Sequence, residues 1–303
     1  MSVQVNNLSK HYGSQKAVNN ISFEVEKGQI LGFLGPNGAG KTTTMKIISC
    51  FIPQTEGDVT VCGHSVSDNP IAVRHEIGYL PENNPLYYDM YVREYLGFVA
   101  NLHKKKLGKN TQARVAEMVE LTGLQREQHK KIRHISKGYK QRVGLAQAMI
   151  HDPQVLILDE PTSGLDPNQL AEIRGVIKAL GKEKTVILST HIMQEVQAMC
   201  DRVIIINKGN LVADDTPENL QQYGRKSLIT VEFANAINEK LLGTLPHIEN
   251  IIPLAANKYQ LTTKNNADIR ADIFNFAIQQ KRTLLTLHQE TANLEEVFRQ
   301  LTA

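Results

Sequence analysis

A glycine-rich loop with one lysine and two threonines occupies residues 35–43 (GPNGAGKTT). Glycines in the pattern Gly-x-x-x-x-Gly-Lys-Thr let successive backbone N–H groups converge on an anion. The apolar run 29–34 before the loop predicts a buried strand, and residues 41–50 after it contain no helix breaker. A strand, this loop and a helix in that order predict a phosphate-binding site, which the helix dipole would strengthen. A glycine-rich turn with an accidental Lys-Thr is the less favoured interpretation.

The loop predicts specific contacts with a nucleoside triphosphate. Lys41 would reach the β- and γ-phosphates, and the Thr42 hydroxyl would bind Mg²⁺. The residues expected to contact the nucleotide are Gly35, Pro36, Asn37, Gly38, Ala39, Gly40, Lys41, Thr42 and Thr43.

Two carboxylates follow the apolar run 155–158 (VLIL). A buried strand that ends in Asp159 and Glu160 delivers both acids to the carboxyl edge of a sheet, where open α/β folds bind ligands. Consecutive strand residues point in opposite directions, so the two acids can differ in role. We expect Asp159 to hold Mg²⁺ and Glu160 to polarise the water that attacks the γ-phosphate. Acids merely solvated at a strand end become the minor interpretation beside the upstream loop.

Ser136 stands directly before the predicted helix 137–150, where a capping residue belongs. Its hydroxyl and the exposed N–H groups of the helix start could form a second anion site. An isolated serine in this place would be only a helix cap. The phosphate loop elsewhere in the chain favours the anion site.

Composition limits the possible partners. The chain has 303 residues with 34 Lys plus Arg against 31 Asp plus Glu, so its net charge of +3 predicts no nucleic-acid partner. No uncharged apolar stretch approaches the roughly 18 residues of a membrane helix, so a membrane role would be peripheral. The three cysteines are widely spaced and show no metal-ligand pattern. They favour a reducing compartment and say nothing about mechanism.

The order of the predicted elements indicates two domains. Strand-like segments precede and follow a mainly helical region at about 71–150, and the later strands alternate with helices, which predicts a parallel α/β sheet. We expect a nucleotide-binding domain over residues 1–222, with a polar boundary around Gly224. Residues 223–303 predict the order β-α-β-β-α-β of a small ferredoxin-like α+β domain with a closing helix. The predicted elements of this domain are strand 227–233, helix 235–242, strands 248–253 and 258–263, helix 268–279, strand 282–289 and helix 294–301.

Together these motifs resemble the ATP-binding subunit of ABC transporters. Residues 35–42 resemble Walker A, 155–160 resemble Walker B, and 135–139 (ISKGY) replace the signature Leu-Ser-Gly-Gly-Gln. Residues 163–166, ending in Asp166, look like the D-loop. His191 looks like the switch histidine. Tyr12, before a glycine, looks like the aromatic residue that stacks on adenine.

The resemblance implies an ABC-type P-loop NTPase domain with antiparallel N-terminal strands and an inserted helical subdomain. ATP and Mg²⁺ would be its cofactors, with Lys41, Glu160 and His191 catalytic and Asp166 close to the nucleotide. Ser136 and Gly138 of one copy would complete the site of a second copy, which makes the expected form a homodimer.

Glu82 is one departure from the family pattern. It stands where the family usually has a glutamine that touches Mg²⁺ and the transmembrane partner. Glu82 can still bind Mg²⁺, directly or through water, but it adds a negative charge near phosphate. A second departure lies in the signature, where Lys137 and Tyr139 replace a glycine and the glutamine.

These departures indicate which branch of the family the chain resembles. Residues 79–95, the sequence Ser-Lys-Gly-Tyr and residues 294–298 (LEEVF) look like the exporter branch called ABC-2 type, and more closely like its gliding-motility-associated ATP-binding subunit. An integral membrane permease subunit would then be the partner, with the chain on the inner face of the cell membrane.

The rival hypothesis is a soluble ABC ATPase that acts on a ribosome, nucleic acid or assembly complex. The near-neutral charge, the single set of nucleotide motifs and the lack of a long coiled-coil insertion argue against it. A scaffold that binds nucleotide without hydrolysis is a weaker rival, because both carboxylates and His191 are present.

Overall fold

The computed structural model describes residues 1–221, 227–235, 237–264, 267–290 and 294–302. These residues form two compact units, one of Met1–Pro217 together with Thr302 and one of Glu218–Leu301. The boundary expected between residues 222 and 223, with its Gly224, lies outside the described residues.

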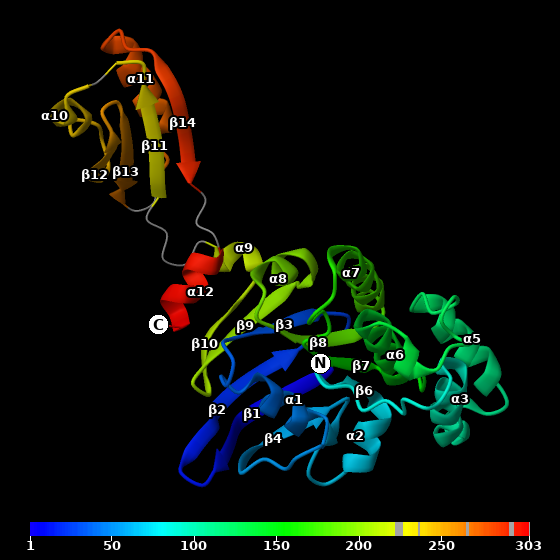
Figure 1. Ribbon diagram of the computed structural model, residues 1–303. Helices are drawn as coiled ribbons and strands as arrows, with labels where there is room; N and C mark the ends of the chain where they lie inside the picture. Colours follow the sequence, from blue (N-terminus) through cyan, green and yellow to red (C-terminus); the bar gives the residue numbers. More distant parts are fainter. Residues whose placement is uncertain (222–226, 236, 265–266, 291–293, 303) are drawn as a thin grey trace. The chain divides into compact units, whose positions relative to one another are not determined.

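A six-stranded sheet in the order β10-β9-β3-β8-β7-β6 forms the centre of the first unit (Figure 1). Its bounds are β3 Ile30–Leu34, β6 Ile77–Leu80, β7 Val155–Asp159, β8 Thr185–Thr190, β9 Arg202–Asn207 and β10 Asn210–Asp215. All strands but β10 pair in parallel. Strands β3, β7 and β8 are buried along their whole length. Both faces of a buried parallel strand must be uncharged, and the one charged residue in these three strands is Asp159, the last residue of β7.

A second sheet, antiparallel and in the order β2-β1-β4-β5, lies beside the first. Its strands are β1 Val3–Tyr12, β2 Gln15–Val25, β4 Glu56–Val61 and β5 His64–Ser65. Buried and exposed residues alternate along parts of β1 and β2, as expected of a sheet with one face on a core. The antiparallel N-terminal strands that the family resemblance implied are therefore present.

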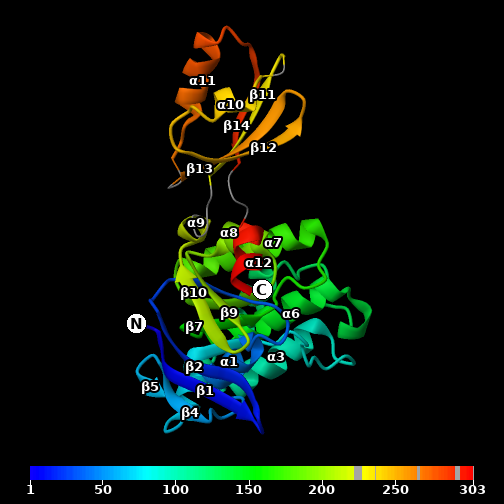
Figure 2. The same cartoon turned by 90° about the vertical axis from the view of Figure 1, so that its left-hand side faces the viewer.

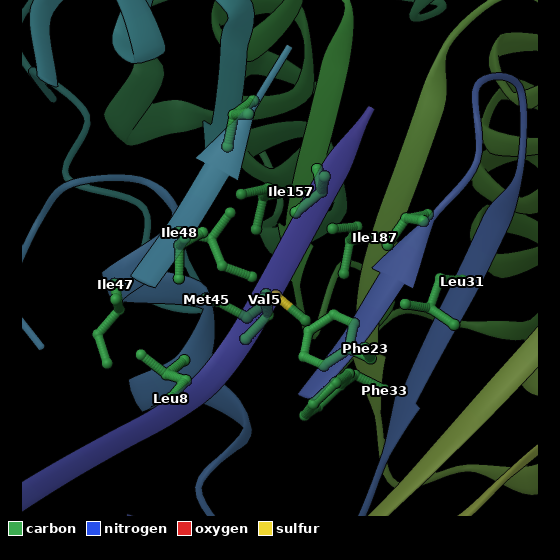
Figure 3. Close-up of a cluster of buried hydrophobic side chains, with 14 of the residues drawn as sticks. Val5, Leu8, Phe23, Leu31, Phe33, Met45, Ile47, Ile48, Ile157 and Ile187 are labelled. Atoms are coloured by element: carbon green, nitrogen blue, oxygen red, sulfur yellow. The ribbon is translucent and has the colours of Figure 1, made fainter. Parts of the chain in front are cut away.

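Helix α1 (Lys41–Ile48) lies between the two sheets. Figure 3 shows its Met45, Ile47 and Ile48 among apolar side chains of both sheets. Phe23 of β2 and Phe33 of β3 meet there with ring centroids 5.4 Å apart. The start of α1, which carries the phosphate-loop lysine, is thus anchored by a buried helix body.

The opposite face of the parallel sheet is covered by α7 (Pro167–Gly181) and α8 (Met193–Met199) (Figure 1). Gly32 of β3 illustrates why this contact is close, since a Cβ there would meet the side chain of Cys200 at the end of α8. Alternate residues of β3 therefore face α1 and α8.

The region 71–150 is not wholly helical, which corrects the sequence prediction. It contains α2 (Pro70–Glu76), then β6, and only then the helices of the inserted subdomain. Strand β6 has only four residues, which are too few to distinguish a strand from a helix by the periodicity of apolar residues. The subdomain helices are α3 Val92–Leu102, α4 Lys104–Leu107, α5 Thr111–Leu121, the 3₁₀ turn η1 Ile132–His134 and α6 Lys137–Met149.

Strand β10 is a second element that the sequence did not predict. It returns antiparallel to β9 through the two-residue turn Lys208-Gly209, in which both residues have positive φ (49° and 80°). Such a turn matches the twist of a hairpin. Helix α9 (Pro217–Leu220) follows.

The second unit has an antiparallel sheet in the order β12-β13-β11-β14, which confirms the ferredoxin-like prediction. Its elements are β11 Ser227–Phe233, α10 Glu239–Leu242, β12 Ile248–Ala255, β13 Lys258–Thr263, α11 Arg270–Gln279 and β14 Leu284–Glu290, followed by α12 Leu294–Thr302, whose last residue belongs to the first unit. Helices α10 and α11 pack on one face of this sheet (Figures 1 and 2). Helix α10 is shorter than the predicted 235–242, because Asn235 and Asn238 favour turns over helix. Within the described residues, no helix is both long and apolar enough to cross a membrane.

Two glycines allow a test of the packing of β6. A Cβ at Gly78 would overlap the carbonyl oxygen of Ala148 in α6, whereas Gly175 in α7 faces open space. We expect G78A to lower the free energy of unfolding by about 1–3 kcal/mol, since the backbone must shift. G175A should raise it by up to about 1 kcal/mol through its higher helix propensity. Denaturant unfolding measures both. Equal effects of the two substitutions would contradict the close approach of β6 and α6.

Candidate functional site

A cleft of about 690 Å³ lies at the carboxyl edge of the parallel sheet. The phosphate loop after β3, Glu160 after β7 and His191 after β8 all reach it. Its lining residues are Tyr12, Gln15, Ala17, Asn37, Gly38, Ala39, Gly40, Lys41, Thr42, Thr43, Glu82, Glu160, Ser163 and His191. This is the edge at which open α/β sheets bind ligands. Most of the residues predicted to contact a nucleotide therefore share one cavity.

The loop owes its shape to Gly40, which caps α1 in the left-handed region with φ 112°. A Cβ at this position would lie 2.5 Å from the carbonyl oxygen of Ala17 in β2, so only glycine fits. Strand β2 therefore packs closely against the loop at the start of α1. Residues 40–43, at the start of α1, line the cleft. The N–H groups of a first helical turn have no partner within the helix, so this end of α1 is suited to binding an anion.

Lys41 begins α1, and its side chain is only 6% exposed. Its ammonium donates to the carbonyl of Gly35 at 2.6 Å and to that of Pro36 at 3.2 Å. Burial lowers the pKa of Lys41, while the nearby carboxylates Glu160, Asp159 and Glu82 act to raise it. Backbone carbonyls of the phosphate loop thus hold the Lys41 ammonium in place.

Thr42 and Asp159 meet as the predicted magnesium ligands should. The Thr42 hydroxyl donates to Asp159 Oδ1 at 3.2 Å, and the Ser189 hydroxyl donates to the same oxygen at 2.5 Å. Asp159 is 1% exposed, and its Oδ2 has no hydrogen-bond partner among the described residues. A buried carboxylate oxygen without a donor fits a cation ligand, and Mg²⁺ is commonly held by one or two protein oxygens plus phosphate. Glu82 lines the same cleft.

Glu160 and His191 form a hydrogen-bonded pair, with 2.9 Å between Oε2 and Nδ1. The other carboxylate oxygen of Glu160 lies 4.0 Å from the Lys41 ammonium. Glu160 has φ 50°, which is unusual for a residue with a side chain and frequent at functional sites. Its N–H donates to the Ser189 hydroxyl at 3.0 Å, which fixes the turn after β7.

Burial raises the pKa of Glu160 above its ordinary value of 4.5, although the hydrogen bond and charge of His191 and the charge of Lys41 oppose the shift. A carboxylate with a raised pKa is a better base than a solvated one. The arrangement can therefore accept a proton from a water molecule next to a bound phosphate.

Six predicted site residues do not line this cleft. Gly35, Pro36 and Asp159 lie directly behind it, hydrogen-bonded to Lys41 or Thr42. The other three lie elsewhere. Ser136 caps α6 by accepting the N–H of Tyr139 at 3.4 Å, and Asp166 caps α7 by accepting the N–H of Gln169 at 2.9 Å. Gly138 packs directly under the Gln169 side chain. Gly164 of the D-loop lies against the Lys137 side chain of the signature segment. Ser163, at the start of the D-loop, still lines the cleft, whereas Ser136, Gly138 and Asp166 do not.

Sequence reasoning missed two kinds of site residue. Gln15 and Ala17 line the cleft from β2 without any motif to mark them. Ser189, which holds both Asp159 and the Glu160 backbone, directly precedes Thr190 and His191 at the end of an apolar run, and that position was its only signal. Tyr12 is half exposed at the mouth of the cleft, with the Lys10 ammonium 5.2 Å from its ring centroid.

Comparison with known proteins agrees with this geometry. Residues 18–163 match the family model described as "ABC transporter". The chain is 33% identical to the "Uncharacterized ABC transporter ATP-binding protein YxlF" of Bacillus subtilis, over 98% of both chains. The chain belongs to the family of ABC transporter ATP-binding proteins. This membership confirms the predicted family, the α/β ABC fold and the prediction that the chain is an ATPase.

Other relatives of this ABC protein carry more specific names. It is 32% identical to the "Linearmycin resistance ATP-binding protein LnrL" of B. subtilis over 99% of this chain and 98% of the relative. It is 38% identical to the "Bacitracin transport ATP-binding protein BcrA" of Bacillus licheniformis over 75% and 73%. A solved structure titled "Dimeric Structure of MJ0796, a Bacterial ABC Transporter Cassette" aligns with TM-score 0.65 at 25% identity, over 71% of this chain and 98% of that one.

The raised pKa of Glu160 predicts a pH-dependent stability difference. Its protonated form is favoured in the folded protein, so the wild type loses stability as pH rises from the unfolded-state pKa through the folded one. E160Q cannot ionise. Its free energy of unfolding should therefore exceed that of the wild type by an amount that grows as the pH rises above 4.5, the ordinary pKa of the carboxyl group. Denaturant unfolding without nucleotide measures the gap. A gap that does not change with pH would rule out the raised pKa.

Proposed function

We propose that this ABC protein is the ATP-hydrolysing motor subunit of an exporter and works as a homodimer. One observation carries the proposal. Lys41, Glu160 and His191 share one cleft, while Ser136 and Gly138 of the signature lie outside it. The signature of a second copy would therefore close the cleft over the nucleotide.

The roles of the chain's own residues follow from the contacts of the cleft. Lys41 exchanges the carbonyls of Gly35 and Pro36 for the β- and γ-phosphates and offsets their charge. Glu160 orients the attacking water and accepts its proton. His191, which is half exposed, forms a hydrogen bond with Glu160 and also contacts the γ-phosphate. Tyr12 stacks on the adenine at the mouth of the cleft.

Mg²⁺ would be held by Thr42 and Asp159, with Glu82 as a further or water-mediated ligand. When bound, it supplies positive charge that stabilises the transferring phosphoryl group. Asp159 Oδ2, which has no hydrogen-bond partner in the part of the chain that the structure describes, supports this role.

The exporter assignment is supported by the relatives. Names of two relatives refer to linearmycin resistance and bacitracin transport, and a third, 36% identical, is the "Nod factor export ATP-binding protein I" of Burkholderia orbicola. The sequence features of the ABC-2 branch point the same way. Within that branch we favour the gliding-motility-associated subunit on the sequence resemblance alone.

An integral membrane permease subunit is the proposed partner, with the chain peripheral on the inner face of the cell membrane. An aromatic patch of Tyr87, Tyr88, Tyr91 and Phe98 supports this, since each side chain is at least 41% exposed and Tyr87 contacts Phe98. Close to it in sequence, a cleft of about 350 Å³ is lined by Phe51, Glu82 and Pro85. Exposed aromatic groups of this kind mark protein interfaces.

E160Q tests the dimer. The amide keeps the shape of the site but is a poor base, so we expect ATP to bind and to remain bound. In the presence of Mg²⁺ and ATP, size-exclusion chromatography should show a dimer for E160Q and a monomer without nucleotide. The double variant K41A/E160Q is the matched control and should stay monomeric, because the phosphate contacts are lost. Calorimetric ATP binding by a strictly monomeric E160Q would refute the closing role of a second copy.

Substitution in the aromatic patch tests whether the partner is a membrane protein. We expect an integral membrane protein to co-purify with the chain from membranes, and F98S to abolish this while ATP hydrolysis by the isolated chain is unchanged. F274S is the matched control, because Phe274 on α11 is an exposed phenylalanine of the second unit, 55% exposed against 41% for Phe98. Recovery of a ribosome or nucleic acid in place of a membrane protein would favour the soluble alternative.

A further inference from the structure

Thr190 and Glu195 form a buried pair that borders His191 on both sides in sequence. The Thr190 hydroxyl donates to Glu195 Oε2 at 2.6 Å, and it accepts the N–H of Ile192 at 3.1 Å. Both residues are fully buried, at 0% exposure. One hydroxyl thus ties the end of β8 to the start of α8, with the histidine between them.

The arrangement is a variant of a capping box. In the usual box, the N3 glutamate of a helix binds the N–H of the N-cap residue directly. Here Ile192 is the N-cap and Glu195 the N3 residue, but the Thr190 hydroxyl is inserted between them. The cap therefore reaches back into β8 and spans His191, which an ordinary capping box would leave outside.

His191 needs such a support because its own side chain is 52% exposed. Packing can hold the side chain only in part, and its hydrogen-bond partner among the described residues is Glu160. The backbone on either side of His191 must then fix the position and direction from which the imidazole side chain extends. Thr190 and Ile192, the two flanking residues, are the ones that the hydroxyl links.

The carboxylate of Glu195 is costly to bury, and nothing in the cleft uses it. Its Oε1 has no hydrogen-bond partner among the described residues, and its Oε2 is held by Thr190. An apolar residue would be the cheaper choice for a fully buried position. A glutamate buried in this place indicates a role beyond stability.

We infer that Thr190 and Glu195 are positioning residues for ATP hydrolysis. They fix the loop that carries His191, so that its ring meets Glu160 and the γ-phosphate at the same time. This inference rests on the proposed role of His191.

The test separates positioning from folding. T190V keeps the shape of the side chain but removes both hydrogen bonds, and we expect kcat for ATP hydrolysis to fall about ten- to a hundredfold with little change in ATP affinity. T190S keeps the hydroxyl and should recover most of kcat. T185V is the matched control, since Thr185 is equally buried at the other end of β8 and also uses its hydroxyl, towards Ser2 and Glu26. It should lower the melting temperature and spare kcat.

A double replacement guards against loss of fold. T190V/E195L makes both partners apolar, which restores stability relative to T190V because no buried carboxylate is left unpaired. Its melting temperature should recover while kcat stays low. Recovery of kcat together with stability would overturn the inference, as would a kcat for T190V equal to that of T185V.

The H191A background distinguishes this inference from the proposed function. If Thr190 acts through His191, single-turnover hydrolysis by H191A should be slow and T190V should slow it no further. Full additivity of the two changes would show that Thr190 does not act through the histidine. Wild-type hydrolysis by H191A would instead refute the proposed role of His191, whatever T190V does in the wild-type background.

Discussion

The parallel register of β3, β8 and β7 is the constraint on which the site depends. Leu34 at the end of β3 pairs with Thr190 at the end of β8, and Ser189 pairs with Asp159 at the end of β7. A slip of one residue would turn every side chain to the other face. The buried, apolar strands exclude such a slip, and the groups that follow them meet at one edge as a result.

The site concentrates charge in a place where charge is expensive. Lys41, Asp159 and Glu160 are all less than a tenth exposed. Each is held by groups that cannot move independently: carbonyls of the phosphate loop, the hydroxyls of Thr42 and Ser189, and the ring of His191. Donors and acceptors arranged before the reaction need no reorganisation during it, which is the basis of electrostatic catalysis.

The parts of this structure that the sequence predicted are those with a local signal. Asp159 and Glu160 follow an apolar run, and Lys41 follows a glycine pattern, so both the elements and the residues could be expected. Strands β6 and β10 could not, because one is short and lies in a helical region and the other depends on the positive φ of Lys208. The burial of Glu195 was also hidden, since a glutamate in the first turn of a helix is ordinarily solvated.

The bonds of Lys41 to the loop carbonyls have a consequence for ligand choice. A ligand must replace two hydrogen bonds of a buried ammonium before it gains anything from the charge. On the contacts proposed for Lys41, a nucleotide with only an α-phosphate would not extend to the lysine and would leave both bonds in place. The affinity of the loop would then depend on the length of the phosphate chain, and the base and sugar would be bound by other parts of the cleft.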